Sequence, residues 1–191
     1  MSKLIAALAF LIAAAANPSA AATIHIVAFG DSATAGYLVP HDKAYPAQLQ
    51  ALLRKKGYDV AVANRGVSGD TIEGALQRFG SAIAPGTNIA IVEFGTNDLR
   101  GGAPIRTVRA RLTELIRSLR ARGIQVLVIG LGKLDLAAVA RANDVLYAQW
   151  TLPPGKYRAR DGAHFNAEGY AIVIGRMLPQ VETLIARAAR K

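Results

Sequence analysis

The fold of this chain is set by the stretch Ile24-His25-Ile26-Val27-Ala28-Phe29-Gly30-Asp31-Ser32. Its first six residues are a short run rich in apolar and β-branched side chains, which predicts a buried strand. The run stops at Gly30, and two polar residues follow at once. In a parallel sheet, ligands bind beyond the carboxyl ends of the strands. The stretch therefore predicts both a strand and the place where a functional group would stand.

The rest of the chain alternates strand and helix patterns in the same way. Further strands are predicted at Ile89–Phe94, Val60–Ala63 and Ile124–Ile129, and helices at Ala44–Lys56, from Thr71 to about Phe79, at Pro104–Arg122, at Leu136–Gln149 and from about Asn166 onward. Strands joined by helical crossovers predict an α/β fold, with a parallel sheet of four to five strands between two helical layers. The fifth strand is hard to place, because little more than Trp150-Thr151-Leu152 precedes the break at Pro153-Pro154-Gly155.

The first residues have the pattern of an export signal. Lys3 gives a positive start, Leu4–Ala16 is apolar but too short to span a bilayer comfortably, and Asn17-Pro18 breaks the run. Ala20-Ala21-Ala22 then offers small residues for a signal peptidase. We expect a signal peptide over residues 1–22 and one domain over residues 23–191. An uncleaved membrane anchor is the alternative.

Composition narrows the class of protein. The 191 residues suit a single domain, and the absence of cysteine excludes disulfides, a thiolate nucleophile and cysteine-bound zinc. An exported protein without disulfides is expected in a bacterial periplasm or outside the cell. The net charge of +10 comes largely from arginines within residues 106–122, interleaved with apolar residues at helical spacing. We interpret them as the solvated face of one helix; a nucleic-acid site is the alternative, and no aromatic or glycine interleaving supports it.

Four separated segments carry residues suited to acyl transfer through a covalent serine intermediate. They are Gly30-Asp31-Ser32, Gly66-Val67-Ser68-Gly69-Asp70-Thr71, Gly95-Thr96-Asn97-Asp98 and Asp161-Gly162-Ala163-His164. Ser32 is a candidate nucleophile, His164 a candidate base, and Asp161 a carboxylate to orient that base. Gly69 and Asn97 are candidate oxyanion donors.

Each segment alone also has a purely structural interpretation. Ser32 could cap a helix, and Asp161 and His164 could belong to an ordinary loop that enters one. The other two histidines, His25 and His41, are interpreted as structural or exposed. Asp31, Asp70 and Asp98 are assigned to turn and network hydrogen bonds. The combination of the four segments favours catalysis.

The order of the four segments resembles the SGNH hydrolase superfamily, also called GDSL esterases/lipases, from about Ile24 to about Tyr170. Gly30–Tyr37 and Asn64–Thr71 look most like the bacterial arylesterase/thioesterase I/lysophospholipase L1 group. Two positions depart from the family pattern: Ala33 stands where leucine is usual, and Phe165 where proline often follows the histidine. The Gly-x-Ser-x-Gly signature of α/β-hydrolases is absent.

The resemblance implies a flavodoxin-like α/β/α sandwich and a Ser32-His164-Asp161 triad. It also implies an oxyanion hole made by the Ser32 and Gly69 backbone N–H groups and the Asn97 side chain. The activity it implies is hydrolysis of acyl esters, with thioesters and lysophospholipids as further substrates. A carbohydrate or cell-envelope O-acetyl esterase and a non-catalytic binding domain with the same fold are the alternatives.

No cofactor or metal is expected, because the phosphate-loop, dinucleotide and His-Glu-x-x-His patterns are absent. The expected partner is a small acyl ester, with no nucleic acid and at most transient contact with a membrane or the cell envelope. The sequence does not fix the oligomeric state.

Overall fold

The computed structural model describes residues 22–151 and 155–190. Five strands form one sheet in the order β2-β1-β3-β4-β5, and every neighbouring pair is parallel. The strands are β1 (Ile24–Gly30), β2 (Val60–Gly66), β3 (Ile89–Glu93), β4 (Gln125–Leu131) and β5 (Leu146–Trp150). The expected signal segment, residues 1–22, lies outside the described residues apart from Ala22.

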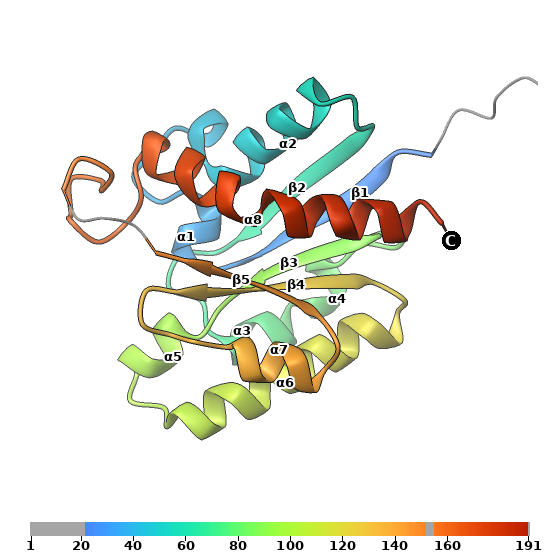
Figure 1. Ribbon diagram of the computed structural model, residues 1–191. Coiled ribbons are helices and arrows are strands. Elements are labelled where there is room, and N and C mark those ends of the chain that lie inside the picture. The colour runs from blue at the N-terminus through green and yellow to red at the C-terminus, as the bar shows by residue number, and fades with distance from the viewer. Residues whose placement is uncertain (1–21, 152–154, 191) are drawn as a thin grey trace, which may run out of the picture.

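Helices cover both faces of the sheet, so the predicted three-layer α/β/α fold is confirmed (Figure 1). One face carries α2 (Tyr45–Lys55) and α8 (Ala167–Ala188); the other carries α3 (Ile72–Gln77), α4 (Phe79–Ala82), α6 (Ile105–Ala121) and α7 (Ala137–Ala142). Two short helices, α1 (Ser32–Ala35) and α5 (Thr96–Arg100), follow β1 and β3 closely, and the 3-10 turn η1 (His41–Lys43) precedes α2. Both short helices therefore stand at the carboxyl edge of the sheet.

The strand β1 shows why the sequence folds in layers. Its side chains alternate between faces, so Ile26 and Ala28 join the core under α2 and α8. Val27 and Phe29 join the core under α3, α6 and α7. All four are at most 4% exposed. Because both faces bury apolar side chains, the central strands are continuous apolar runs, which is what made them visible in the sequence.

The predicted helix Leu136–Gln149 is wrong in its second half. Helix α7 ends at Ala142, Asp144 adopts a left-handed φ of 51°, and β5 begins at Leu146. The strand pairs with β4 from Leu127↔Leu146 to Leu131↔Trp150. This pairing and the complete burial of Trp150 are tertiary interactions that override the local helical pattern.

The predicted helix that ends near Phe79 is divided into α3 and α4, which meet at Arg78. The arginine-rich helix is α6, close to its predicted bounds. Its buried residues are Val108, Leu112, Leu115, Ile116 and Leu119, and its arginines are exposed. The interpretation of these arginines as a solvated face agrees with this burial. Within the described ranges, no helix is both long and apolar enough to cross a membrane.

The close packing of β2 against the end of α1 gives a stability prediction. A Cβ added at Gly66 would lie 2.1 Å from the backbone nitrogen of Ala35, which cannot move without displacing α1. We expect Gly66→Ala to lower the free energy of unfolding by about 1–3 kcal/mol or more. Thermal unfolding measures this. Gly80→Ala is the matched control, because nothing lies within 4 Å of its added Cβ. Equal melting temperatures for the two variants would contradict the packing argument.

Candidate active site

Ser32 stands on the tight turn that joins β1 to α1. Asp31 is the N-cap of α1, and its Oδ1 accepts a hydrogen bond from the Ala33 backbone N–H at 2.9 Å. Ser32 is the first residue of the helix and is partly exposed, whereas Asp31 is 2% exposed. The helix entry therefore presents the Ser32 hydroxyl at the carboxyl edge of the sheet and keeps the Asp31 carboxyl beneath it.

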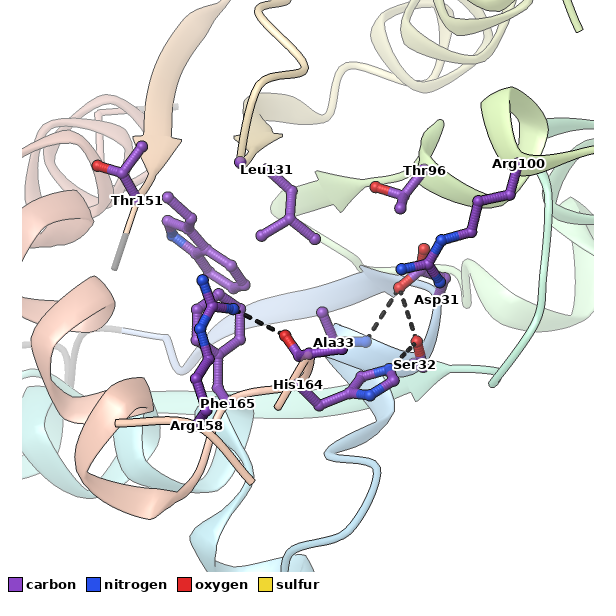
Figure 2. A pocket seen from close by; sticks show the side chains of 13 residues that line it. Asp31, Ser32, Ala33, Thr96, Arg100, Leu131, Thr151, Arg158, His164 and Phe165 are labelled. Carbon is purple, nitrogen blue, oxygen red and sulfur yellow. Dashed lines mark hydrogen bonds between the residues drawn. The ribbon is translucent and has the colours of Figure 1, made fainter. Parts of the chain in front are cut away.

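His164 and Asp161 lie on the loop between β5 and α8, and this loop meets the Ser32 turn. His164 Nε2 is 2.9 Å from Ser32 Oγ, and His164 Nδ1 is 2.5 Å from Asp161 Oδ2. Asp161 Oδ1 also accepts the backbone N–H groups of Ala163 and His164, each at 3.0 Å. The Asp161 carboxylate thus fixes both its own loop and the imidazole (Figure 2 shows the Ser32–His164 contact).

The hydrogen bond from the imidazole lowers the pKa of Asp161 far below its ordinary value, and the backbone N–H of His164 adds to this effect. The carboxyl is therefore ionised at any ordinary pH. An ionised Asp161 accepts the Nδ1 proton and leaves Nε2 free to accept the Ser32 hydroxyl proton. The geometry gives the ring the tautomer that a general base needs.

Asn97 lies in the first turn of α5, just after Gly95, whose φ is +111°. Its side-chain nitrogen donates to Asp31 Oδ2 at 3.1 Å and to the Asp70 carbonyl at 2.9 Å. Both N–H bonds of this amide are therefore engaged. Asp70 directly follows Gly69, whose φ of +82° places it in the left-handed region. The Asn97 amide ties the Gly69 turn to the Ser32 turn.

A cavity of about 280 Å³ opens beside Ser32 and His164. Its wall includes the apolar side chains Leu131, Trp150 and Phe165. Thr96 and Arg100 from α5 line it as well, and Arg100 reaches toward the pocket that Asp31 and Ser32 also line (Figure 2). The cavity combines an apolar wall with a few polar groups, which is typical of a site for a small organic ligand.

Comparison with known proteins shows the family to which this chain belongs. The model of the GDSL-like Lipase/Acylhydrolase family matches residues 28–151, which is more than half of the chain. The chain belongs to this family. The matched region contains the segments of Ser32, Gly69 and Asn97, and it ends before the loop of Asp161 and His164.

Two curated relatives and one solved structure illustrate the similarity. The chain is 31% identical over 105 residues to an arylesterase of Vibrio mimicus, covering 54% of this chain and 52% of that protein. It is 36% identical over 115 residues to the esterase TesA of Pseudomonas aeruginosa, covering 59% and 56%. The chain thus spans about half the length of the curated relatives it matches. A crystal structure of TesA superposes with a TM-score of 0.74 at 23% identity, covering 84% of this chain and 99% of that one, which supports the fold.

The two residues that depart from the GDSL family pattern, Ala33 and Phe165, both make defined contacts in the core. Ala33 is buried, and its carbonyl accepts a hydrogen bond from the Tyr170 hydroxyl at 2.8 Å, which ties α8 to the Ser32 turn. Phe165 is 2% exposed and packs edge-on against Trp150, with ring centroids 5.9 Å apart. The phenylalanine therefore anchors the His164 loop in the core by burial.

Several neighbours of the site were missed by sequence reasoning. Arg78 forms an ion pair with Asp70 at 2.7 Å and lies 4.5 Å from the centre of the Phe29 ring, so it braces the Gly69 turn. Tyr37 packs edge-on against the His164 ring at 4.9 Å. Arg78 belongs to no recognisable pattern. Tyr37 ends the family-like segment Gly30–Tyr37, but nothing in that segment indicates its contact with His164.

A third missed residue, Glu93, could have been noticed in the sequence. Glu93 is a carboxylic acid at the end of the apolar run that forms β3, and it is 1% exposed. A charged residue inside a run that otherwise predicts complete burial is uncommon and marks a site that needs a partner.

Proposed function

We propose that this chain is an exported serine esterase that hydrolyses acyl esters through an acyl-enzyme intermediate. One observation carries the proposal: Ser32, His164 and Asp161 form a continuous chain of contacts of 2.9 and 2.5 Å at the mouth of a partly apolar cavity. A hydroxyl, an imidazole and a carboxylate in this order are the parts of a serine hydrolase, and the family relationship adds support.

The proposed reaction begins with attack of Ser32 Oγ on the ester carbonyl carbon. His164 Nε2 takes the hydroxyl proton and returns it to the leaving alcohol, and Asp161 stabilises the imidazolium in between. A water molecule then attacks the acyl-enzyme with the same assistance from His164. The acid leaves, and Ser32 regains its proton.

The oxyanion of each tetrahedral intermediate needs donors that are already in place. We assign this role to the Ser32 and Gly69 backbone N–H groups and to the Asn97 amide. Asn97 is held by Asp31 and by the Asp70 carbonyl, which supports a fixed orientation. The oxyanion would share one of the amide protons that now contact these oxygens.

Asn97→Ala tests the third donor. The interaction strengthens only as negative charge develops, so we expect kcat to fall by about 10²–10³-fold with little change in KM. Steady-state kinetics on one p-nitrophenyl ester measures both constants. Thr107→Ala, an exposed change on α6, is the control and should leave both unchanged. A variant whose KM alone rises would show that Asn97 binds substrate in the ground state.

The cavity supports a proposal for the substrate class. Its volume of about 280 Å³ is near the lower end of the ~300–1,000 Å³ of small-molecule sites, and Leu131, Trp150 and Phe165 supply apolar walls. We therefore propose short- to medium-chain acyl esters, with thioesters and lysophospholipids as further substrates. Hydrolysis of p-nitrophenyl esters of increasing chain length, beside acetylated sugars, tests this. Preference for the sugars would favour an O-acetyl esterase, and no hydrolysis at all would favour a binding domain.

Export is a separate part of the proposal. Cleavage after Ala22 would leave every described strand and helix intact, because β1 begins at Ile24. The side chain of Thr23 donates a hydrogen bond to Asp59 at 2.7 Å, so the new N-terminus would lie beside the start of β2. Mass spectrometry of the protein from the periplasm and medium of a bacterial host would locate the cleavage site. A full-length protein held in the membrane would support the anchor instead.

A further inference from the structure

The buried carboxyl group of Glu93 has no cation beside it. Glu93 lies at the end of β3, and its Oε2 accepts a hydrogen bond from the Thr34 hydroxyl at 3.1 Å. Its Oε1 is buried, and none of the donors in the described ranges pairs with it. Nor does Glu93 take part in any of the ion pairs found there. A buried carboxylate without a counter-charge is costly, so this group needs another way to be satisfied.

The neighbour of Glu93 is Asp31, which connects the two halves of the site. Asp31 Oδ1 accepts the Ala33 N–H at 2.9 Å and lies 3.5 Å from the Ser32 hydroxyl oxygen. Asp31 Oδ2 accepts the Asn97 amide at 3.1 Å. The Asp31 carboxyl therefore holds both the nucleophile turn and the amide assigned to the oxyanion.

Asp31 lies next to Glu93, because Gly30, the residue before Asp31, pairs with Glu93 across β1 and β3. A hydrogen bond between the two carboxyl groups requires one of them to carry a proton, because carboxylate oxygens are acceptors alone. Asp31 already accepts two N–H donors, which favours its ionised form. Glu93 accepts one hydroxyl and has an oxygen with no donor, which favours its neutral form.

Burial and nearby charge favour the same assignment. Burial raises the pKa of Glu93 well above its ordinary value, and the negative charge of Asp31 raises it further. Burial also raises the pKa of Asp31, but the hydrogen bond from the Ala33 N–H opposes that rise. In a pair of this kind, the second proton leaves only at a much higher pH than the first.

We propose that Glu93 is a positioning residue of this site, a neutral carboxylic acid whose proton is donated to Asp31 in a hydrogen bond that holds Asp31 against Ala33 and Asn97. The proposal rests on the roles proposed above for Ser32 and Asn97. The proton on Glu93 also limits the charge under the oxyanion hole to one carboxylate. Two ionised carboxylates there would oppose the negative charge that develops on the substrate.

Two variants test whether Glu93 acts as a neutral hydrogen-bond donor or only fills space in the core. Glu93→Gln keeps the shape, the neutral charge and an N–H donor toward Asp31, whereas Glu93→Leu removes the donor. We expect Glu93→Leu to lower kcat by about tenfold or more, the range for a buried acceptor left without its partner, with a smaller change in KM. Glu93→Gln should keep most of the wild-type kcat. Equal loss in both variants would overturn the proposal.

Infrared spectroscopy tests the proton itself and needs no catalysis. At neutral pH the wild-type protein and Ser32→Ala should both show the carbonyl band of a protonated carboxylic acid, shifted in D₂O. The band should be missing from Glu93→Gln. Its absence from the wild type, or its persistence in Glu93→Gln, would overturn the proposal. If no ester is hydrolysed, the proposed function fails, and this spectrum still decides the state of Glu93.

Discussion

Ser32→Ala is expected to remove esterase activity to near the background rate. The variant keeps His164, Asp161 and the cavity, but it has no oxygen to attack the ester carbon. In Ser-His-Asp enzymes, loss of the serine lowers the rate by about 10⁴-fold or more, and what remains comes from binding and the oxyanion hole. Kinetics on a p-nitrophenyl ester that the wild type hydrolyses well would measure the loss.

The comparison must exclude unfolding as the cause. Ser32 is partly exposed, and the N-cap bond from Ala33 to Asp31 does not depend on its side chain. Circular dichroism and melting temperature should therefore match the wild type. Ser68→Ala is the matched control, because Ser68 is the other serine within the four segments and is exposed. Full activity in Ser32→Ala together with loss in Ser68→Ala would assign the nucleophile elsewhere.

His164→Ala should be nearly as inactive as Ser32→Ala, whereas Asp161→Asn should keep measurable activity. In the proposed mechanism, His164 accepts and returns the proton across its 2.9 Å contact with Ser32 Oγ, and the described side-chain contacts of Ser32 include no other histidine. In the same mechanism, Asp161 only orients the ring and offsets its charge. The loop also has supports beyond Asp161, because the Arg158 guanidinium donates to the Ala163 carbonyl at 2.7 Å and Phe165 is buried.

The dependence of activity on pH tests whether His164 is the group that takes the Ser32 proton. The pKa of Asp161 is held far below its ordinary value, so this carboxylate stays charged as the pH falls through the weakly acidic range. Loss of activity on acidification should therefore come from protonation of the imidazole, which then cannot accept the Ser32 proton. Equal losses in His164→Ala and Asp161→Asn would show that orientation matters as much as proton transfer. A robustly active His164→Ala would refute the mechanism.

The central strands and the site segments could be predicted from the sequence for the same physical reason. A strand buried on both faces is a continuous apolar run, so Ile24–Phe29 and Ile89–Phe94 are visible, and the polar residues that end them mark the edge where ligands bind. The strand β5 was not visible, because it lies at the edge of the sheet and its pattern is mixed. Its position depends on pairing with β4.

The contacts that hold the site together could not be predicted from the sequence. Nothing near Asn97 in the chain indicates that Asp31 and the Asp70 carbonyl hold its amide. Arg78 belongs to no motif, yet it joins Asp70 to the Gly30 carbonyl. These partners come from different strands and helices, so only the register of the sheet brings them within hydrogen-bond distance.

Covalent labelling tests the central claim most directly, that Ser32 is a nucleophile activated by His164. The wild type, Ser32→Ala and His164→Ala would each be incubated with a serine-directed phosphonate, and the modified residue located by peptide mass spectrometry. The account predicts one adduct on Ser32 in the wild type, none in Ser32→Ala and very slow labelling in His164→Ala. An adduct on Ser68, or labelling of Ser32 at the same rate without His164, would contradict it.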